Sequence, residues 1–291
     1  MIFLSTTSDG LHTAGLGSIT QWHLLLFCIA KELDVNVSID PYHRIGHNYS
    51  SASDWDETFT KFFNFPYTQK FDADINFDGS YDELQEGLIS IQKEYGNTEK
   101  VAVHISHETI KSIMVSNPNL ISIFCEKRYL DEIKNNFSIE DTYFSSEYLN
   151  ISFHIRVENP KDTDHAYYLR ETVYDLNKEF NRHKNIVKYI KDNNPDKKIH
   201  LHIHSQGSID EYNNFYQFCD ENFKLSLHLD DNPIKDIYHM SIADYLIMAN
   251  SSYSWMCHLL NSNTTFARNN FWQPMNSKVK YLDYNYNVIE N

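Results

Sequence analysis

The sequence predicts an α/β protein in which strands and helices alternate and the strands form parallel sheets. The first observation is the order at the amino terminus, where residues 1–6 read as a strand, 15–18 as a glycine loop and the following run as a helix. The second is the later half of the chain, where short apolar or alternating segments recur between helical ones. With 291 residues, of which 41% are hydrophobic, the chain is long enough for one large or two medium domains.

The first half carries the weaker pattern. Its clearest element is the helix after the glycine loop, where apolar residues from Trp22 to Leu33 recur near the helical period. The other expected elements are strands at 35–39, 101–106 and 120–126 and helices at 55–65, 108–115 and 130–136. The polar stretch 136–148 is expected to join an amino-terminal domain, residues 1–145, to a carboxy-terminal domain, residues 146–291.

The second half alternates more clearly. We expect strands at 150–157, 199–204, 225–229 and 245–249, and helices within 166–193 and at 209–222, 233–243 and 254–260. Strands that alternate with helices predict a parallel sheet, and the ligands of such sheets bind beyond the carboxyl ends of the strands. The candidate functional residues are therefore sought at those ends.

The charge of the chain excludes some classes of partner. The formal net charge is −15 with a pI of about 5.4, and the densest basic run, 184–198, is interrupted by Asp192 and Asp196. Such a chain would repel a nucleic acid, so no nucleic-acid partner is expected. The apolar run 24–30 is too short to span a bilayer and no basic leader precedes it, so no transmembrane segment and a cytoplasmic location are expected.

His154 and Arg156 lie near the end of the strand at 150–157 and point to the same face. The planar arginine fork can bind a phosphate through two hydrogen bonds and stabilise the charge of a leaving group. An ion pair with an acid of the next loop, Asp162 or Asp164, is the structural alternative, and this segment alone leaves both open.

His200, His202 and His204 also share one strand face, which raises the alternative of a metal-dependent hydrolase. Same-face neighbours on a strand lie roughly 6.5–7 Å apart, which is wide for three ligands of one ion, so structural roles are expected. Ser205 and Gln206 follow in a polar turn before Gly207, where a glycine permits an unusual backbone angle and close approach of a ligand.

The run 234–260 reads as helix, strand, serine-rich turn and helix. Ser251 and Ser252 are suitable caps for the last helix, and the free amides at a helix start can bind a diphosphate without a metal ion. Asp236 on the preceding helix could accept hydrogen bonds from a base or ribose, whereas Asp244 is expected to anchor the junction between helix and strand.

The glycine loop near the amino terminus is the weakest signal. Gly15, Leu16 and Gly17 could approach a ligand, but a single Gly-x-Gly lacks the complete dinucleotide fingerprint. Ordinary turn glycines are the alternative.

These segments together resemble the fucosyltransferase superfamily that includes core α1,6-fucosyltransferases and nodulation fucosyltransferases. The family's strand ending in His-x-Arg is matched by His154-Ile155-Arg156, and its Asp-Ile-His/Tyr-x-x-Ser-x-Ala-Asp motif with a later Ser-Ser turn is matched by residues 236–244 and Ser251-Ser252. The loop at 15–18 is similar to the family's opening glycine loop. The similarity is dense from about residue 150 to 275 and patchy before that.

The resemblance implies a GT-B-like arrangement of two Rossmann-like halves with parallel sheets facing a central cleft, the first half on the acceptor side and the second holding a nucleotide sugar. It implies an inverting transfer of a sugar to a glycan acceptor, with GDP as the nucleotide, fucose as the sugar and no metal cofactor. The donor would be held by the residues that match or neighbour the family's motifs: His154, Arg156, Ser205, Gln206, Asp236, Ser251, Ser252 and Tyr253.

Two positions depart from the family's pattern. Val157 replaces its second arginine, and Glu158 or Asn159 stands where an aspartate is usual, which leaves the sugar and the general base open. Glu158 is the candidate base. Besides the metal-dependent hydrolase, a non-catalytic carbohydrate-binding module remains an alternative, because aromatic rings can stack on sugars.

Overall fold

The computed structural model describes residues 1–6, 15–43, 45–46, 54–137, 139, 141–157, 176–220, 223–269, 275, 278–283 and 287–289. The chain divides into two compact units, Met1–Phe137 with Pro274–Asn276, and Ser138–Gln273 with Ser277–Asn291. None of the helices within the described ranges is both long and apolar enough to cross a membrane.

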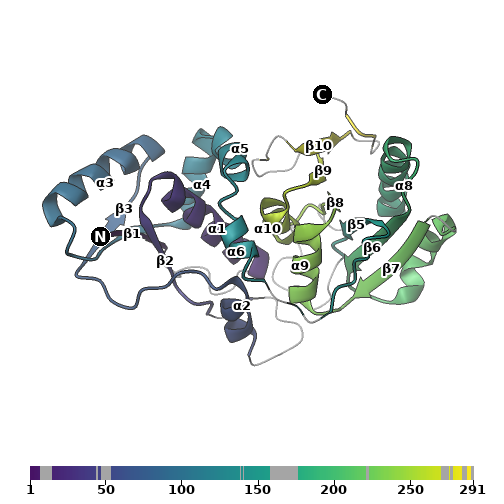
Figure 1. Ribbon diagram of the computed structural model, residues 1–291, viewed down its shortest axis with the longest axis horizontal. Coiled ribbons are helices and arrows are strands. Elements are labelled where there is room, and N and C mark those ends of the chain that lie inside the picture. Colours follow the sequence, from purple (N-terminus) through teal and green to yellow (C-terminus); the bar gives the residue numbers. More distant parts are fainter. Residues whose placement is uncertain are drawn as a thin grey trace. The chain divides into compact units, whose positions relative to one another are not determined.

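The first unit contains a four-stranded parallel sheet in the order β2-β1-β4-β3 (Figure 1). Its strands are β1 (Ile2–Thr6), β2 (Asn36–Ile39), β3 (Ala73–Phe77) and β4 (Val101–Ile105). Its helices are α1 (Leu16–Glu32), α2 (Trp55–Phe63), α3 (Tyr81–Tyr95), α4 (His107–Ser116), α5 (Asn119–Glu126) and α6 (Asp131–Lys134). The predicted opening strand, helix and second strand are confirmed, but of the expected loop at 15–18 Gly15 alone precedes α1, and residues 16–18 form its first turn.

One predicted element of this unit is wrong. Residues 120–126 were expected to be a strand but lie in α5. The buried residues are Leu120, Ile121 and Phe124, a spacing that one helical face provides and that strict alternation does not. β3 and α3 were not predicted; β3 is an edge strand without a fully buried residue, which weakens its apolar pattern.

The second unit contains a six-stranded parallel sheet in the order β10-β9-β8-β5-β6-β7 (Figure 1). Its strands are β5 (Leu149–His154), β6 (Ile199–Ser205), β7 (Phe223–Leu229), β8 (Tyr245–Ile247), β9 (Thr264–Arg268) and β10 (Val279–Leu282). Its helices are α8 (Leu176–Asn193), the 3₁₀ segment η1 (Ile209–Phe218), α9 (Pro233–Ile242) and α10 (Ser252–Leu260). Two all-parallel sheets thus confirm the predicted α/β class; β9 and β10 were not predicted.

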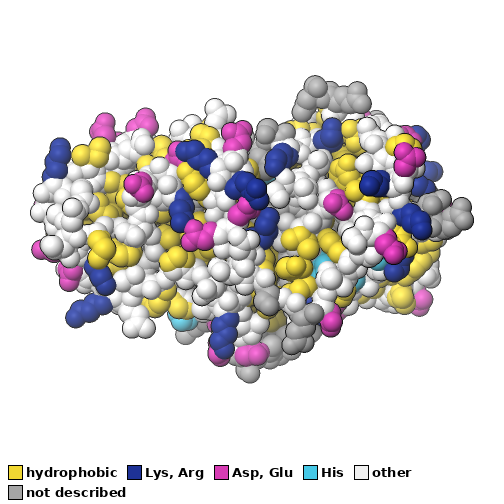
Figure 2. Space-filling view, in the orientation of Figure 1, with side chains coloured by type: hydrophobic (Ala, Val, Ile, Leu, Met, Phe, Trp, Pro, Cys, Tyr) yellow, Lys and Arg dark blue, Asp and Glu magenta, His cyan; other side chains and the backbone are white. Residues whose placement is uncertain are grey.

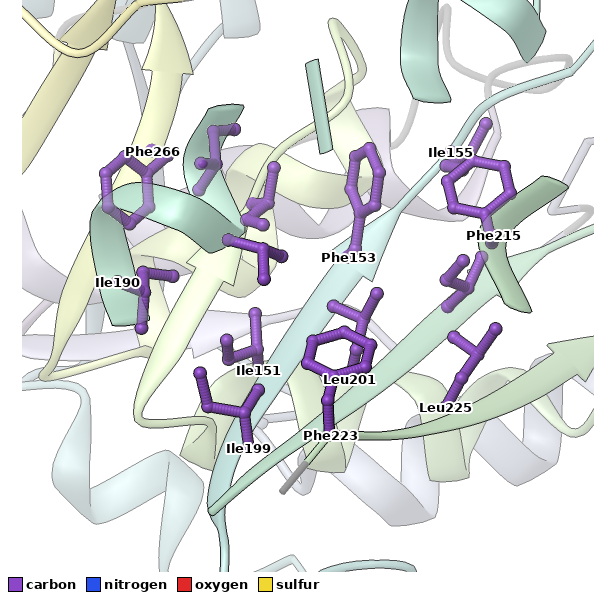
Figure 3. Packing of buried hydrophobic residues seen from close by; sticks show 14 of the residues in the cluster. Ile151, Phe153, Ile155, Ile190, Ile199, Leu201, Phe215, Phe223, Leu225 and Phe266 are labelled. Carbon is purple, nitrogen blue, oxygen red and sulfur yellow. The ribbon is translucent and has the colours of Figure 1, made fainter. Parts of the chain in front are cut away.

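The apolar face of this sheet forms the core of the second unit. Alternate residues of β5, among them Ile151 and Phe153, pack with Ile186 and Ile190 of α8 and with Phe215 of η1 (Figure 3). Each of these side chains is at most 1% exposed. The intervening residues of β5, β6 and β7 therefore face the opposite side, toward α9 and α10.

Arg182 reinforces the same core from α8. Its side chain is fully buried, donates a hydrogen bond from Nη2 to the carbonyl of Met248 and lies with its guanidinium 5.7 Å from the centre of the Phe153 ring. Through these two contacts Arg182 links β5 to the segment that follows β8, near the carboxyl ends of both strands.

Figure 2 shows acidic and basic side chains interspersed over the face in view. On this face no extended basic surface gathers among the described residues.

Phe153→Ala tests the position of this core. The ring is 0% exposed, so its removal should lower the free energy of unfolding by about 3–5 kcal/mol through lost burial and a residual cavity. Ile209→Ala is the control in the same unit, because Ile209 is 57% exposed and should change stability by no more than about 0.5 kcal/mol. Urea unfolding measures both, and equal effects would contradict the assigned core.

Candidate functional site at the carboxyl edge of the second sheet

The candidate site lies where β5, β6 and β7 end. In the parallel register His154 pairs with His204, and His204 pairs with His228, so three imidazoles stand side by side on neighbouring strands. All three belong to the face opposite the apolar core. The amino termini of α9 and α10 meet this edge through the contacts described next.

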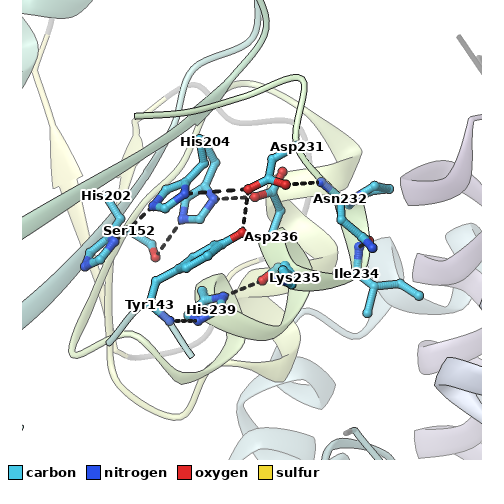
Figure 4. A network of polar contacts seen from close by, with 12 residues as sticks. Tyr143, Ser152, His202, His204, Asp231, Asn232, Ile234, Lys235, Asp236 and His239 are labelled. Carbon is cyan, nitrogen blue, oxygen red and sulfur yellow. Dashed lines mark hydrogen bonds and ion pairs between the residues drawn. The ribbon is translucent and has the colours of Figure 1, made fainter. Parts of the chain in front are cut away.

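His204 links β6 to α9. Its Nδ1 lies 2.6 Å from Oδ1 of Asp236, and its Nε2 lies 3.2 Å from the hydroxyl oxygen of Ser152 on β5 (Figure 4). The His204 side chain is 1% exposed and that of Asp236 is 13% exposed. Asp236, which was predicted to bind a ligand, therefore lies at the edge of the sheet and is hydrogen-bonded to the buried His204.

His154 links β5 to α10. Its Nδ1 is hydrogen-bonded to the hydroxyl of Ser254, and its ring centre lies 5.4 Å from that of Tyr253. Both partners belong to the first turn of α10, whose cap is Ser251: the Ser251 hydroxyl accepts a hydrogen bond from the Tyr253 N–H at 3.2 Å. The end of β5 and the start of α10 are thus adjacent.

Tyr253 joins the starts of the two helices. Its hydroxyl donates to the carbonyl of Pro233, the first residue of α9, at 2.9 Å. Burial and the nearby negative charge of Asp236 raise the pKa of Tyr253 well above its usual value, so this phenol stays protonated as a donor. Ser252, the next predicted residue, is half-buried between Ser251 and Tyr253.

Arg156 lies two residues beyond His154 and is half-buried. Burial lowers the pKa of His154 to about 3, and the positive charge of Arg156 contributes to that shift, followed by His204. The guanidinium is therefore close enough to His154 to act on it electrostatically, and His154 is neutral at pH 7. The strand end that carries Arg156 is the one that His154 joins to α10.

Beneath the site, histidine and aromatic rings form a packed layer on the polar face of the sheet. Tyr143 stacks on His228 and on His239, with ring centres 4.1 and 4.3 Å apart, and Phe144 lies 4.8 Å from His202. His200 and His202 follow along β6 with ring centres 3.8 Å apart. We call these residues, with His204, the histidine layer.

Burial holds four members of the histidine layer, His200, His202, His228 and His239, in their neutral form. Burial, before the charges of neighbouring groups, lowers the pKa of His200 and of His239 to about 4, that of His228 to about 3, and that of His202 further still. In His239, Nδ1 donates to the carbonyl of Lys235 at 2.6 Å and Nε2 accepts from the Tyr143 N–H at 2.8 Å, which fixes the tautomer.

The predicted histidine cluster on β6 thus forms, but its nitrogens serve protein partners. His200 Nε2 lies 2.8 Å from the Ser226 hydroxyl, and His202 Nδ1 lies 3.1 Å from His228 Nε2. Within the described ranges, no three His, Cys, Asp or Glu side chains are placed to hold a metal ion. The metal-dependent alternative finds no support in this part of the chain, and independence from metal stays a prediction.

The turn after β6 has a different role from the one its polarity suggests. The Ser205 hydroxyl is buried and donates to the carbonyl of Ile155 at 2.8 Å, and the Tyr212 hydroxyl donates to the Gln206 carbonyl at 2.7 Å. Gly207 has φ of +106°, which confirms the expected unusual angle. The Ser205 side chain and the Gln206 carbonyl therefore hold the turn, while the Gln206 side chain is half-buried.

Several predicted residues lie elsewhere. Gly15 precedes α1 in the first unit, and Leu16 and Gly17 are buried in its first turn. Glu158, the candidate base, lies outside the described residues. Asp244 anchors the start of β5, as predicted: its carboxylate accepts from the Asn150 N–H at 2.8 Å.

The sequence pattern did not predict five residues that contact the site residues or the histidine layer: Ser152, Ser254, Tyr143, His228 and His239. For His228 a signal existed, because the alternation Lys-Leu-Ser-Leu-His-Leu places it on the same face as a polar neighbour. The other partners come from segments far away in the sequence: Tyr143 and His239 are separated by 96 residues and His154 and Ser254 by 100. Their pairing depends on the sheet order.

Comparison with known proteins gives matches among solved structures alone. No family model matches the chain, and no curated protein matches it. POFUT1 in complex with GDP-fucose matches with a TM-score of 0.44 and 10% identity, covering 96% of each chain. NodZ α-1,6-fucosyltransferase soaked with GDP-fucose matches with a TM-score of 0.37 and 10% identity, covering 100% of this chain and 99% of that one. A likeness this remote does not specify a donor or an acceptor.

The lowered pKa values of His200, His228 and His239 predict that stability falls on acidification. Histidines in the unfolded chain bind protons below about pH 6.5, whereas these three in the folded chain resist protonation down to pKa values of about 3 to 4. The unfolded state therefore gains protons first, and each such histidine should remove roughly 2 kcal/mol from the free energy of unfolding between pH 7.5 and 5.

Urea unfolding of His228→Asn at the two pH values checks this dependence. The variant should lose roughly 1–2 kcal/mol less than the parent chain on acidification, since one titrating group is gone. His43→Asn is the control, because His43 is exposed and should leave the pH dependence unchanged. An unaltered acid loss in His228→Asn would show that the layer is not responsible.

Proposed function

We propose that the protein is a glycosyltransferase that transfers a sugar from a nucleoside-diphosphate donor to a glycan acceptor. The observation that carries the proposal is the convergence of the His-x-Arg strand end with the starts of α9 and α10. The contacts His154–Ser254, His204–Asp236 and Tyr253–Pro233 join these elements within the second unit. A carboxylate, an arginine and a capped helix start then lie at one edge of a parallel sheet, the usual location of a nucleotide.

In this proposal the two ends of the donor have separate anchors. Asp236 accepts hydrogen bonds from the base, and the amides of the first turn of α10, with Ser251, Ser252 and Tyr253, bind the diphosphate. Arg156 pairs with the terminal phosphate and stabilises the charge that develops as the nucleoside diphosphate leaves, which is the largest single contribution expected for such a reaction. A divalent cation is then not required.

The finer assignments follow from the sequence resemblance. It favours GDP as the nucleotide, fucose as the sugar, and an inverting attack by an acceptor hydroxyl on the anomeric carbon. Glu158 is the candidate base, two residues beyond Arg156. Some of the matching solved structures are complexes with GDP or GDP-fucose, but their likeness to this chain is too remote to bear on the choice of donor.

Nucleotide binding is the direct test. A ligand at about 100 times its dissociation constant raises the free energy of unfolding by roughly 2.7 kcal/mol. Thermal unfolding with GDP, UDP, CDP and TDP should therefore show a clear rise in melting temperature with GDP and smaller rises with the others. No stabilisation by any nucleoside diphosphate would remove the basis for a nucleotide-sugar enzyme and favour a carbohydrate-binding module.

Arg156→Ala tests the catalytic step. Loss of the guanidinium should lower turnover by roughly 10²–10³-fold, about 3–4 kcal/mol of transition-state stabilisation, by analogy with a lost oxyanion donor. The melting temperature should change little, because Arg156 is half-buried beyond the strand and is not part of the core. Arg128→Ala, at an exposed position of the first unit, is the control and should keep full turnover. Normal turnover in a folded Arg156→Ala protein would exclude this role.

A further inference from the structure

We propose that His204 is a positioning residue that fixes the Asp236 carboxylate for recognition of a base with two adjacent N–H donors. The inference rests on the proposed function, because it concerns the end of the donor opposite the diphosphate. Its observation is the buried chain of hydrogen bonds from Ser152 through His204 to Asp236 (Figure 4). His204 lies in none of the motifs on which the sequence resemblance rests.

The direction of this chain follows from the chemistry of its members. A carboxylate oxygen accepts hydrogen bonds, so Nδ1 of His204 donates to Oδ1 of Asp236 at 2.6 Å. Nε2 of the same ring is hydrogen-bonded to the Ser152 hydroxyl at 3.2 Å. Ser152 is 0% exposed, so it does not exchange this bond for water. Ser152 therefore restrains the Nε2 side of the ring, which keeps Nδ1 directed at Asp236.

The His204 ring is also held in place by its neighbours. His228 on β7 stacks against it with ring centres 4.9 Å apart and an interplanar angle of 20°. With Ser152 on β5 at one nitrogen and Asp236 on α9 at the other, the ring is restrained by both adjacent strands and by the helix. A ring restrained in this way holds Asp236 in one rotamer before a ligand arrives, which lowers the cost of ordering on binding.

The second oxygen of Asp236 is the one a ligand would meet. Within the described part of the chain Oδ2 has no hydrogen-bond partner from the protein, and the side chain is 13% exposed. Oδ1 retains one lone-pair direction beside its bond to His204. The fixed carboxylate thus offers two parallel acceptors, and such a pair matches an edge that carries two adjacent N–H donors.

Among the common nucleobases guanine presents such an edge, with its ring N1–H beside its exocyclic amine. Uracil and thymine present one N–H between two carbonyls, while adenine and cytosine place an acceptor next to their amine. A carboxylate left free to rotate could make single hydrogen bonds with several of these bases. A carboxylate held by His204 favours the paired contact, so His204 should affect discrimination between bases.

Titration calorimetry of GDP, IDP and UDP against the full chain tests the inference. IDP lacks the exocyclic amine and so reports on the second hydrogen bond. The parent protein should bind GDP about tenfold more tightly than IDP, the value of one hydrogen bond to a charged group. His204→Leu should bring the affinity for GDP close to that for IDP. Ser152→Ala should do so partly, because the His204 ring loses its restraint at Nε2.

His204→Asn provides the rescue. The asparagine amide can place an N–H near the position of Nδ1, so GDP should again be preferred over IDP. His200→Leu is the matched control: the residue has the same type, strand and face, but it contacts Ser226 rather than Asp236, and its GDP-to-IDP ratio should equal that of the parent chain. If His204→Leu does not fold, Ser152→Ala and His204→Asn carry the test.

The results separate this inference from the proposed function. If the parent chain binds none of the three nucleotides, the proposed function fails and the inference fails with it. If the parent chain prefers GDP and Asp236→Asn abolishes that preference, the function stands. An unchanged ratio of GDP to IDP affinity in Ser152→Ala and in a folded His204 variant would then overturn the positioning role alone.

Discussion

The alternation of side chains along β5, β6 and β7 is the constraint on which the candidate site depends. Once Ile151 and Phe153 pack against α8, His154 must face the opposite side of the sheet. The same division on β6 and β7 places His204 and His228 beside it, because the three strands pair in parallel register. A slip of one residue would reverse both faces at once, so burial of the apolar side also fixes the polar row.

The histidine layer shows how the second sheet can bury many polar side chains on the face toward α9 and α10. Burial keeps His200, His202, His228 and His239 neutral, and a neutral imidazole has one donor and one acceptor, which suits a chain of partners. His239, between Lys235 and Tyr143, follows this rule. These four imidazoles therefore fill the polar face of the sheet without adding positive charge to it.

The residues that could be predicted from sequence are those whose position along an element already implies a role. His154 ends a strand and Arg156 follows two residues later, Ser251 caps a helix, and Asp236 stands in the first turn of another. Period and capping signals suffice for each. The partners that orient them could not be predicted in this way, because Ser254 and Tyr143 reach the site through the sheet order and not through their local pattern. The mistaken strand at 120–126 has a related cause: a short apolar run has no period of its own, and the surrounding packing decides.

The two hydrogen bonds at the carboxyl edge restrain different parts of the proposed donor site, and their combination has a consequence for specificity. His154 joins the strand end that carries Arg156 to α10, while His204 joins β6 to α9. The bond from Tyr253 to Pro233 then ties the starts of the two helices together. In the proposed function these three hydrogen bonds therefore fix the base-binding residue Asp236 and the diphosphate-binding start of α10 relative to each other. Two anchors held at a fixed separation select a ligand by the distance between its two ends as well as by their chemistry. A ligand of another length would have to break one of these hydrogen bonds to reach both anchors.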